Sequence, residues 1–331
     1  MSEHSLYPLR FDPIFQYRLW GGRRLGAWMD RTLPADEPVG EAWLLSDRDD
    51  HPSLVAEGPL KGCSLPRLMA RSKKAILGRK AHRFDRFPLL LKFLDVRQML
   101  SVQVHPADGM ADLIPNGESG KTEAWVVLEA EPDARVYAGL KPGASRERLA
   151  ALSVGTVDDF LNSFTPVVDQ AILIEAGTVH SLGDGVMVFE VQENSDVTYR
   201  LYDWDHVDAR TGKPRDLQVD RALACVNFDQ GEVAPVEAVV METALNRRER
   251  LLDTAYFQVM RVSGASPFDV GADDEPRILV GLAGGGRIAH DGCDHVLGRG
   301  DVVLLPASVG ACRFTPDGPA VVLDIAIPDI A

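Results

Sequence analysis

Four side chains from three short segments together have the chemistry of a metal site. Gln103 and His105 lie two residues apart in the β-rich segment LSVQVHP, so both side chains point to the same face of a predicted strand. Glu123 opens the next predicted strand, EAWVVLEA, and His180 ends a later one, AILIEAGTVH. Two imidazoles, a carboxylate and an amide oxygen suit zinc, with coordination positions left open for water or a substrate. Because only one of these ligands is anionic, the site would keep a positive charge and act as a Lewis acid.

Each of these residues alone is more often a packing or turn residue than a ligand, but their motifs follow a definite order. QVHP, GKTE and GTVH succeed one another and are followed by ENSDVTYRLYDW. This series resembles the signatures of the type I mannose-6-phosphate isomerases, in particular their short bacterial form. The resemblance spans most of the chain, from LWGG at Leu19–Gly22 and GEAW at Gly40–Trp43 to TGKPRDL at Thr211–Leu217.

The resemblance implies that Gln103, His105, Glu123 and His180 hold one zinc ion per chain. It also implies a pair of jelly-roll cupin domains, of which only the first binds metal. The implied activity is that of an aldose–ketose isomerase, which interconverts mannose 6-phosphate and fructose 6-phosphate through a cis-enediolate. The substrate would therefore be a phosphorylated hexose. One departure is visible, because longer relatives carry a histidine where this chain has Gly120.

Four further residues fit the chemistry of an anionic sugar. Lys92 interrupts the apolar strand LLLKFLDV, where it either faces a cavity with an anion or extends to water at the strand edge; the resemblance favours substrate binding. Lys121 lies two residues before Glu123 and hence near the expected metal. Glu190 and Arg200 resemble the active-site glutamate and arginine of the family, although a cross-strand ion pair would also explain them.

These residues suggest a division of catalytic roles. Zinc and Arg200 would stabilise the negative charge that develops on oxygen, while Lys121 or Glu190 would carry the proton as general base and acid. Lys92 is one candidate for binding the phosphate group. The sequence does not decide between Lys121 and Glu190.

The elements that must position these residues are mainly strands. Short β-rich runs bounded by turn residues recur along the chain, which is typical of antiparallel barrels. Helices are expected at about 64–81 and 144–164. The polar segment DHVDARTGKPRD and the helix-like VDRALACVNF precede a second β-rich set, which begins near Tyr256. We therefore predict a mainly β protein of two cupin-type (jelly-roll) barrels with a few short helices, in which residues 1–230 contain the metal site and residues 231–331 do not.

The two β-rich sets look like a distant internal repeat. AILIEAGTVHSL in the first set corresponds in pattern to VVLLPASVGACRF in the second. Aligning Ala176 with Ala307 puts Ala311 opposite His180, so the second set lacks this imidazole. We expect one functional and one structural barrel.

The composition argues against several classes of binding partner. The 331 residues carry a formal net charge of −14, which opposes binding to nucleic acid and to anionic membranes. No apolar run approaches the roughly 20 residues of a membrane span. Without an evident export signal we expect a cytoplasmic protein, as a monomer or weak homo-oligomer. The four scattered cysteines contain no CxxC pair and favour neither a disulfide framework nor a thiolate zinc site.

Two other functions remain open from the sequence. Another metal-dependent cupin enzyme, such as an iron oxygenase, would usually use three histidines rather than a glutamine ligand, and would not need Lys92, Lys121 and Arg200 together. A non-catalytic sugar-phosphate sensor could retain the metal site, although a degenerate sensor would be expected to lose some acid/base residues. Turnover separates the sensor from the enzyme.

Overall fold

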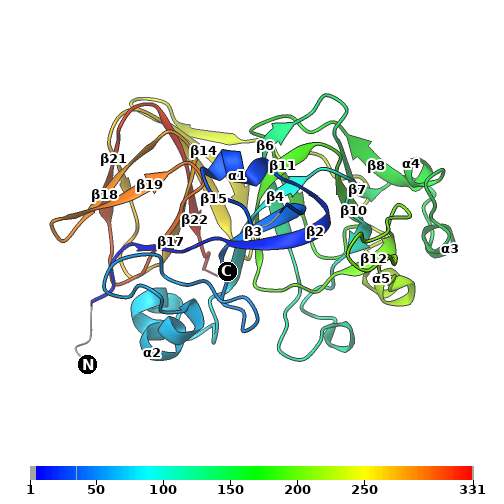
Figure 1. Ribbon diagram of the computed structural model, residues 1–331, viewed down its shortest axis with the longest axis horizontal. Helices are drawn as coiled ribbons and strands as arrows, with labels where there is room; N and C mark the ends of the chain where they lie inside the picture. Colours follow the sequence, from blue (N-terminus) through cyan, green and yellow to red (C-terminus); the bar gives the residue numbers. More distant parts are fainter. Residues whose placement is uncertain (1–4, 35, 330–331) are drawn as a thin grey trace.

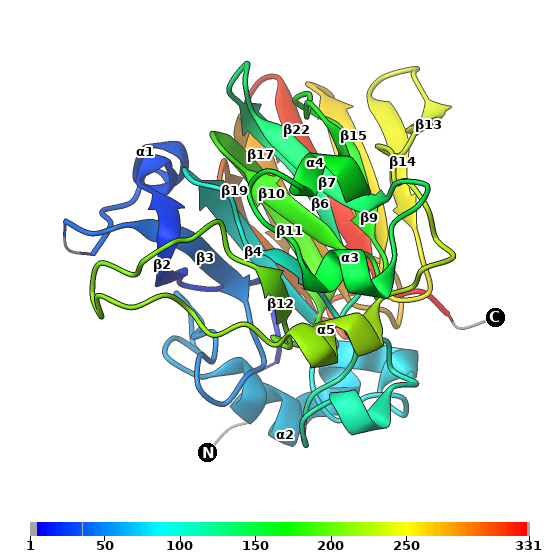
Figure 2. The same ribbon diagram turned by 90° about the vertical axis from the view of Figure 1, so that its right-hand side faces the viewer.

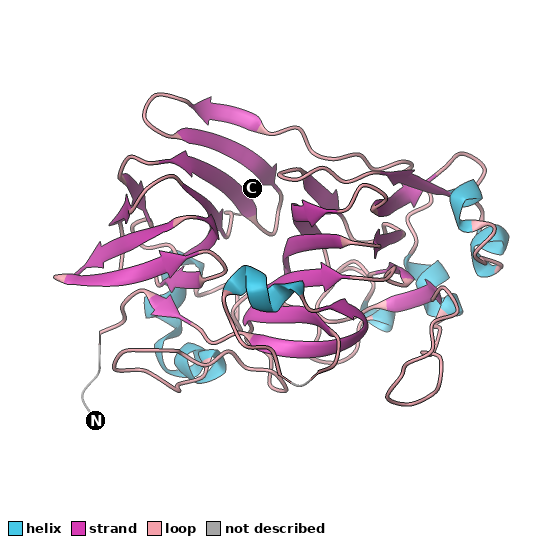
Figure 3. Ribbon diagram, turned by 45° about the horizontal axis from the view of Figure 1, so that its top comes forward, coloured by secondary structure: helices cyan, strands magenta, loops and turns pink. Residues whose placement is uncertain are grey.

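Strands form the body of the computed structural model, which describes residues 5–34 and 36–329. Figure 3 shows short helices beside the strands that make up most of the molecule. Two β barrels lie side by side in Figure 1, with the C-terminal third of the chain, in yellow to red, on the left. The predicted fold class, mainly β with two cupin-type barrels and a few short helices, is confirmed.

Two antiparallel sheets build the first barrel. The larger sheet contains, in spatial order, β2 (Ile14–Gly22), β3 (Val39–Leu45), β4 (Leu89–Val96), β11 (Val186–Glu193), β6 (Glu123–Ala130) and β9 (Ala171–Ile174). The smaller sheet contains β12 (Tyr199–Tyr202), β5 (Val102–Val104), β10 (His180–Gly183), β7 (Arg135–Leu140) and β8 (Leu161–Phe164). Val127 and Val188 of the larger sheet pack in one buried cluster with Val136 and Leu182 of the smaller sheet. Burial of alternate residues from both sheets therefore holds them face to face.

Two more antiparallel sheets build the second barrel. The larger contains β1 (Leu9–Arg10), β20 (Val302–Leu305), β17 (Arg277–Ala283), β22 (Ala320–Ala326), β15 (Gln258–Gly264), β14 (Arg247–Asp253) and β13 (Val239–Glu242). The smaller contains β16 (Phe268–Val270), β21 (Cys312–Pro316), β18 (Gly285–His290) and β19 (Cys293–Gly298). One hydrophobic cluster includes Phe93 and Phe189 from the first barrel with Leu251 and Ile325 from the second. The barrels thus share a core, and the division of the chain at residue 230 stays a prediction.

Helices cover the ends of the barrels. They are α1 (Arg24–Met29), α2 (Leu65–Leu77), α3 (Arg146–Ala150), α4 (Val157–Phe160) and α5 (Val219–Cys225), with 3-10 turns η1 (Gly78–Lys80) and η2 (Ala111–Leu113). The helix expected at 64–81 is confirmed as α2 followed by η1. Figure 2 places α2 below the barrels and α5 near β12. Among the described helices none has the length and apolar character needed to cross a membrane.

The single helix predicted over 144–164 is wrong. This segment contains α3, α4 and strand β8. The side chain of Ser145 accepts a hydrogen bond from the amide of Arg148 and caps α3. Ser153 and Thr156 then hydrogen-bond to each other's backbone or side chain and form a turn. Such local side-chain contacts compete with helical hydrogen bonds, and they end the helix where apolar spacing alone would continue it.

The second barrel begins earlier than Tyr256. Strands β13 and β14 precede it and pair with each other, and β14 pairs with β15. Strand β14 was not predicted because its sequence, RRERLLD, contains charged residues that obscure the apolar alternation expected of a strand. Glu249 of β14 pairs with Arg247 of the same strand and with Arg261 of β15.

Candidate active site

Three of the predicted ligands meet in the first barrel. Donor atoms of His105, Glu123 and His180 all lie within 4.8 Å of one another, and we call these residues the metal cluster. His105 follows β5, Glu123 opens β6 in the facing sheet, and His180 opens β10 rather than ending a strand. The side chains of the cluster are at most 1% exposed. Antiparallel pairing of β5 with β10 sets Gln103 directly opposite His180.

The backbone hydrogen bonds of the two imidazoles engage Nδ1 of each ring and direct Nε2 of each ring towards the metal cluster. His105 Nδ1 lies 2.8 Å from the carbonyl oxygen of Val197, and His180 Nδ1 lies 2.9 Å from that of Thr178. A carbonyl only accepts, so both Nδ1 atoms donate and both Nε2 atoms carry a lone pair. These Nε2 atoms lie 3.4 and 3.5 Å from the carboxylate of Glu123.

Lone pairs that face a carboxylate in a buried site need a cation between them. His105 Nε2 and Glu123 Oε2 are buried and make no hydrogen bond among the described residues, and of these two atoms only Glu123 Oε2 has an ion-pair partner at short range, Lys121 Nζ at 2.9 Å. Buried polar atoms are rarely left in this state, since desolvation without a partner is unfavourable. The donor set of two imidazoles and a carboxylate therefore fits a metal ion.

The electrostatics of the metal cluster favour the protonation states that metal binding requires. Burial, together with the charge of Lys121, lowers the pKa of His105 to about 3. Burial also lowers the pKa of His180. Burial alone would raise the pKa of Glu123, but the charge of Lys121 outweighs it and, with the His105 ring beside the carboxylate, holds this pKa well below its usual range. Neutral imidazoles and an ionised carboxylate are the ligating forms.

The fourth predicted ligand, Gln103, lies beside the metal cluster. Its Nε2 atom is 3.1 Å from His180 Nε2, and Ser101 Oγ donates to its Oε1 at 3.0 Å. A half-turn of the amide exchanges the nitrogen and the oxygen within nearly the same shape. That half-turn would direct Oε1 at the metal cluster, and the Ser101 hydroxyl would then accept from Nε2. The role of Gln103 as a ligand stays a prediction.

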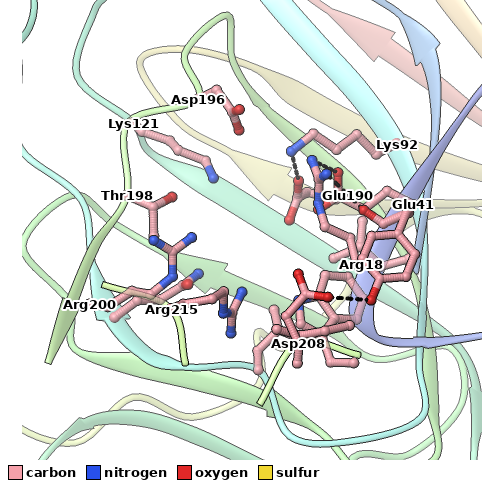
Figure 4. A pocket seen from close by; sticks show the side chains of 16 residues that line it. Arg18, Glu41, Lys92, Lys121, Glu190, Asp196, Thr198, Arg200, Asp208 and Arg215 are labelled. Carbon is pink, nitrogen blue, oxygen red and sulfur yellow. Dashed lines mark hydrogen bonds and ion pairs between the residues drawn. The ribbon is translucent and has the colours of Figure 1, made fainter. Parts of the chain in front are cut away.

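A cavity of about 430 Å³ opens beside the metal cluster. Figure 4 shows Lys121, Thr198 and Arg200 on one side of it and Lys92, Glu190 and Arg18 on the other. Its walls are formed by Tyr17, Arg18, Leu19, Trp20, Glu41, Lys92, Leu94, Leu100, Gln103, Lys121, Glu190, Asp196, Thr198, Arg200, Asp208 and Arg215. All four residues expected to bind or transform a substrate are thus in one cavity, and Gln103 and Lys121 connect it to the metal cluster.

Lys121 lies between the cavity and the metal cluster. Its side chain is 5% exposed, and its Nζ is 2.9 Å from Glu123 Oε2, an ion-pair distance without the angle of a hydrogen bond. The ammonium group is therefore held next to the metal cluster by charge attraction rather than by a directed bond. It remains able to contact a ligand in the cavity.

Lys92 and Glu190 form a buried ion pair across β4 and β11. The register sets them opposite each other, with Nζ 3.0 Å from Glu190 Oε1. Lys92 also donates to Gln192 Oε1 at 2.7 Å, and Trp125 Nε1 donates to Glu190 Oε2 at 3.1 Å. Burial raises the pKa of Glu190 although Lys92 opposes this shift. Of the two positions considered for Lys92, the structure shows the cavity-facing one, with Glu190 as its anion.

Arg200 has a different environment from the other cavity cations. It lies opposite Gln103 in the β12–β5 pairing. No ion-pair partner of Arg200 is found in residues 5–34 and 36–329, so the cross-strand pair with Glu190 considered above is absent there. Burial, with the nearby charge of Arg215, lowers the pKa of Arg200. The guanidinium is half-buried and its Nε atom has no hydrogen-bond partner among the described residues, so an anionic ligand in the cavity would stabilise it.

Sequence reasoning missed several cavity residues. Asp196 and Thr198 precede Arg200 at intervals of two, so strand alternation from Arg200 backwards was a signal that could have found them. Arg215 lies within the TGKPRDL motif already noted. Arg18 gave no such signal, since its position depends on the pairing of β2 with β3.

Glu41 anchors one wall of the cavity. Its Oε2 accepts hydrogen bonds from Arg18 at 2.9 Å and from Trp43 Nε1 at 2.7 Å. Burial alone would raise the pKa of Glu41, but the charges of Arg18 and Lys92 and these hydrogen bonds lower it to about 2. The ionised carboxylate is thus a stabilising component of the fold.

The ionised Glu41 carboxylate predicts part of the loss of folding stability in acid. The folded pKa of Glu41 lies below its ordinary value of 4.5, so its contribution is complete above about pH 4.5 and is lost as the pH falls towards 2. The contribution is on the order of 3 kcal/mol. Urea unfolding of zinc-free protein at pH 3 to 7 should show a shallower loss of stability in acid for Glu41→Gln than for the wild type. Equal slopes for the two proteins would contradict this assignment.

The fold and the site define a cupin-type protein with a metal-ligand cluster beside a polar cavity. A family model for the catalytic domain of type I phosphomannose isomerase matches residues 9–134. Mannose-6-phosphate isomerase ManA of Bacillus subtilis is 34% identical over 311 residues, which cover 93% of this chain and 95% of that protein. Mannose-6-phosphate isomerase of Streptococcus mutans is 31% identical over 315 residues, 94% of this chain and 96% of that protein.

A solved structure gives the same assignment. The crystal structure of mannose 6-phosphate isomerase from Bacillus subtilis superimposes with a TM-score of 0.88 at 28% identity, and the match covers 97% of this chain and 99% of that one. The chain belongs to the type I mannose-6-phosphate isomerase family. The resemblance inferred from the sequence motifs is confirmed.

Proposed function

We propose that this protein is a zinc-dependent isomerase that interconverts mannose 6-phosphate and fructose 6-phosphate through a cis-enediolate. The observation that carries the proposal is the unpaired guanidinium of Arg200, which faces the same cavity as Lys121 beside the metal cluster. An anion site, a proton carrier and a metal site within one cavity are what aldose–ketose isomerisation of a sugar phosphate needs. The names of the relatives supply the substrate.

Gln103, His105, Glu123 and His180 would hold the zinc ion. Bound zinc would supply a Lewis acid that stabilises negative charge on the oxygens of the sugar. The absence of a thiolate and the single carboxylate favour retention of that positive character. His105 Nε2 and Glu123 Oε2, which make no hydrogen bond among the described residues, support the assignment.

We assign the proton transfer to Lys121. Conversion of the aldose removes the proton from C2 and returns a proton to C1, while the hydroxyl proton of O2 is lost and O1 gains one. The carrier must reach both carbons, which places it beside the metal cluster, and Lys121 Nζ lies 2.9 Å from Glu123 there. Glu190 is less suited because Lys92 and Trp125 already occupy its carboxylate oxygens. We propose that Glu190 and Lys92 instead bind hydroxyl groups of the sugar.

Arg200 would stabilise the enediolate oxyanion, which would be the anionic partner that this half-buried guanidinium lacks among the described residues. The phosphate group would bind further along the same wall, where Thr198 and Arg215 lie. A guanidinium suits phosphate because its planar donors match the oxygens. This assignment makes Lys92 a ligand of the sugar rather than of the phosphate, because its charge is already paired with Glu190.

Replacing Arg215 tests the phosphate assignment. Arg215→Gln should raise KM for mannose 6-phosphate by roughly 10-fold and change kcat by less than about threefold, since the phosphate contact is the same in ground and transition states. Lys213→Gln, an exposed change on the same loop, should leave both constants unaltered. Because Arg215 also pairs with Asp203, thermal unfolding must be compared. An unchanged KM in a folded Arg215 variant would exclude the phosphate contact.

Turnover separates this function from a sugar-phosphate sensor. The zinc-loaded protein is offered mannose 6-phosphate, glucose 6-phosphate and mannose, and formation of the ketose is followed by NMR. We expect fructose 6-phosphate from mannose 6-phosphate and far slower conversion of unphosphorylated mannose, because the phosphate contacts would help to orient the sugar. Saturable binding of mannose 6-phosphate without any product would identify a sensor instead. The cytoplasmic location, the oligomeric state and the division at residue 230 remain predictions.

A further inference from the structure

The position of Lys121 depends on a loop. Residues 118–122 have no regular secondary structure, so contacts from outside the loop must hold the backbone that carries this side chain. Three consecutive amides each donate a hydrogen bond. Gly120 N donates to Asp108 Oδ1 at 2.8 Å, and Lys121 N donates to the carbonyl of Pro106 at 3.0 Å. Thr122 N donates to Glu193 Oε2 at 2.7 Å.

We propose that Asp108 and Glu193 are positioning residues for the reaction. Their carboxylates form a clamp, which we call the carboxylate clamp, on the amides immediately before and after Lys121. The clamp fixes the direction in which the Lys121 ammonium enters the cavity. This inference rests on the proton-transfer role proposed for Lys121.

The environment of Glu193 is unusual for a residue that only stabilises the fold. It is the last residue of β11 and is 6% exposed, and its own amide donates to the carbonyl of Thr122 at 3.2 Å. The ion pairs within the described ranges include none for Glu193, so its carboxylate is buried against the Thr122 amide without a cation. Burial, with the nearby charge of Asp108, raises the pKa of Glu193 to about 7. The hydrogen bond to the loop offsets part of this unfavourable burial.

Gly120 allows the close contact that the clamp requires. A Cβ atom at this position would lie 2.5 Å from the amide nitrogen of Asp108 and 2.9 Å from the carbonyl carbon of Ala107. Both neighbours are backbone atoms, which cannot move aside as the end of a side chain can. Any other residue at position 120 would push the loop away from Asp108 and displace Lys121.

The second barrel contributes to the clamp through Tyr256. This residue lies in the turn between β14 and β15, and its hydroxyl donates to Asp108 Oδ2 at 3.3 Å. Thr254 Oγ1 accepts the Tyr256 amide at 3.1 Å and fixes the turn. Asp108 therefore links the second barrel to the loop at residues 118–122, because one of its oxygens contacts Tyr256 and the other holds Gly120.

Amide hydrogen exchange tests the clamp without any reference to turnover. In the zinc-loaded full-length protein, exchange at Gly120 and Thr122 should be slow. Glu193→Ala and Asp108→Ala should speed exchange at the amide that each side chain binds by at least about 10-fold. Glu193→Gln and Asp108→Asn retain an accepting oxygen and should keep the protection. Unchanged exchange in the alanine variants would overturn the clamp, whatever reaction the protein catalyses.

Kinetics test whether the clamp positions Lys121. At equal zinc content, Glu193→Ala should lower kcat for mannose 6-phosphate on the order of 100-fold with KM within about twofold, because a displaced catalytic group is the main defect. Glu193→Gln should restore kcat to within about threefold of the wild type. Glu175→Ala, which removes an exposed carboxylate next to β9, is the matched control. Faster exchange with unchanged kcat would overturn the positioning role.

The two measurements also separate this inference from the proposed function. If the zinc-loaded wild type does not isomerise mannose 6-phosphate, the proposed function fails, and with it the positioning of a catalytic Lys121. The hydrogen-exchange result still decides whether the carboxylate clamp exists. Normal turnover in the wild type with equal loss of activity in Glu193→Ala and Glu193→Gln would overturn the inference alone.

Discussion

Glu123→Gln is expected to lose zinc during dialysis against a chelator that leaves the wild type loaded, and to lower kcat/KM by roughly 10³-fold. Glu123 is the only anionic member of the metal cluster, and its side chain is 1% exposed. Removing its charge leaves Lys121 without its anion and the metal with neutral ligands only. Loss of a Lewis acid removes several kcal/mol of transition-state stabilisation, which corresponds to that change in rate.

The control for this variant is Glu175→Gln, because Glu175 is exposed and lies in the turn between β9 and β10. It should retain both zinc and activity. Zinc content by mass spectrometry, measured beside kcat/KM, distinguishes loss of metal from loss of folding. Full zinc occupancy and near-normal turnover in Glu123→Gln would exclude Glu123 as a ligand.

Lys121→Met should lower kcat by about 10²- to 10⁴-fold while the metal cluster keeps its zinc. Methionine preserves much of the length and the apolar body of lysine but cannot carry a proton. In heavy water the wild-type enzyme should place solvent deuterium at C1 of fructose 6-phosphate, because the abstracted proton exchanges on the carrier. This incorporation should disappear together with turnover in Lys121→Met.

Glu190→Gln is the matched comparison. It keeps the shape of the side chain and its contact with Trp125 but removes the charge opposite Lys92. We expect a smaller effect, about 10-fold, seen partly in KM, if Glu190 binds the sugar. Loss of deuterium incorporation in Glu190→Gln, with retention in Lys121→Met, would transfer the proton-carrying role to Glu190.

The candidate site could be predicted largely because its chemistry is concentrated in short motifs. The QVHP, GKTE and GTVH segments each contribute one residue to the metal cluster. What the motifs could not give is orientation. The amide nitrogen of Gln103 rather than its oxygen faces His180, and the Nδ1 hydrogen bonds that direct His105 and His180 are made to backbone carbonyls, which any sequence supplies.

The missed cavity residues depend on contacts between distant segments. Arg18 and Glu41 enter the site because β2 pairs with β3 and β3 with β4, where Trp43 lies opposite Lys92. Local patterns carry no information about such pairings. Alternation within one strand was readable, and it could have added Asp196 and Thr198 from the position of Arg200.

The fold shows the same difference between local patterns, which the sequence reveals, and pairings of distant segments, which it does not. Two barrels were predictable from runs of apolar residues between turn signals, and α2 from its apolar spacing. The pairing of β1 with β20, which sets Leu9 opposite Leu304, joins the ends of the chain and has no local signal. Strand β14 was missed because charged residues interrupt its apolar alternation, and the partner of Glu249 on β15, Arg261, is distant enough in the sequence to give no local signal. In both cases tertiary partners determine the structure.

The most direct test of the whole account is isomerisation of mannose 6-phosphate to fructose 6-phosphate by the purified protein, measured as isolated, after chelation and after addition of zinc. We predict that activity is lost on chelation and restored by zinc. Absence of turnover in folded, zinc-loaded protein would contradict the assigned reaction, and full activity after complete removal of metal would contradict the role of the metal cluster.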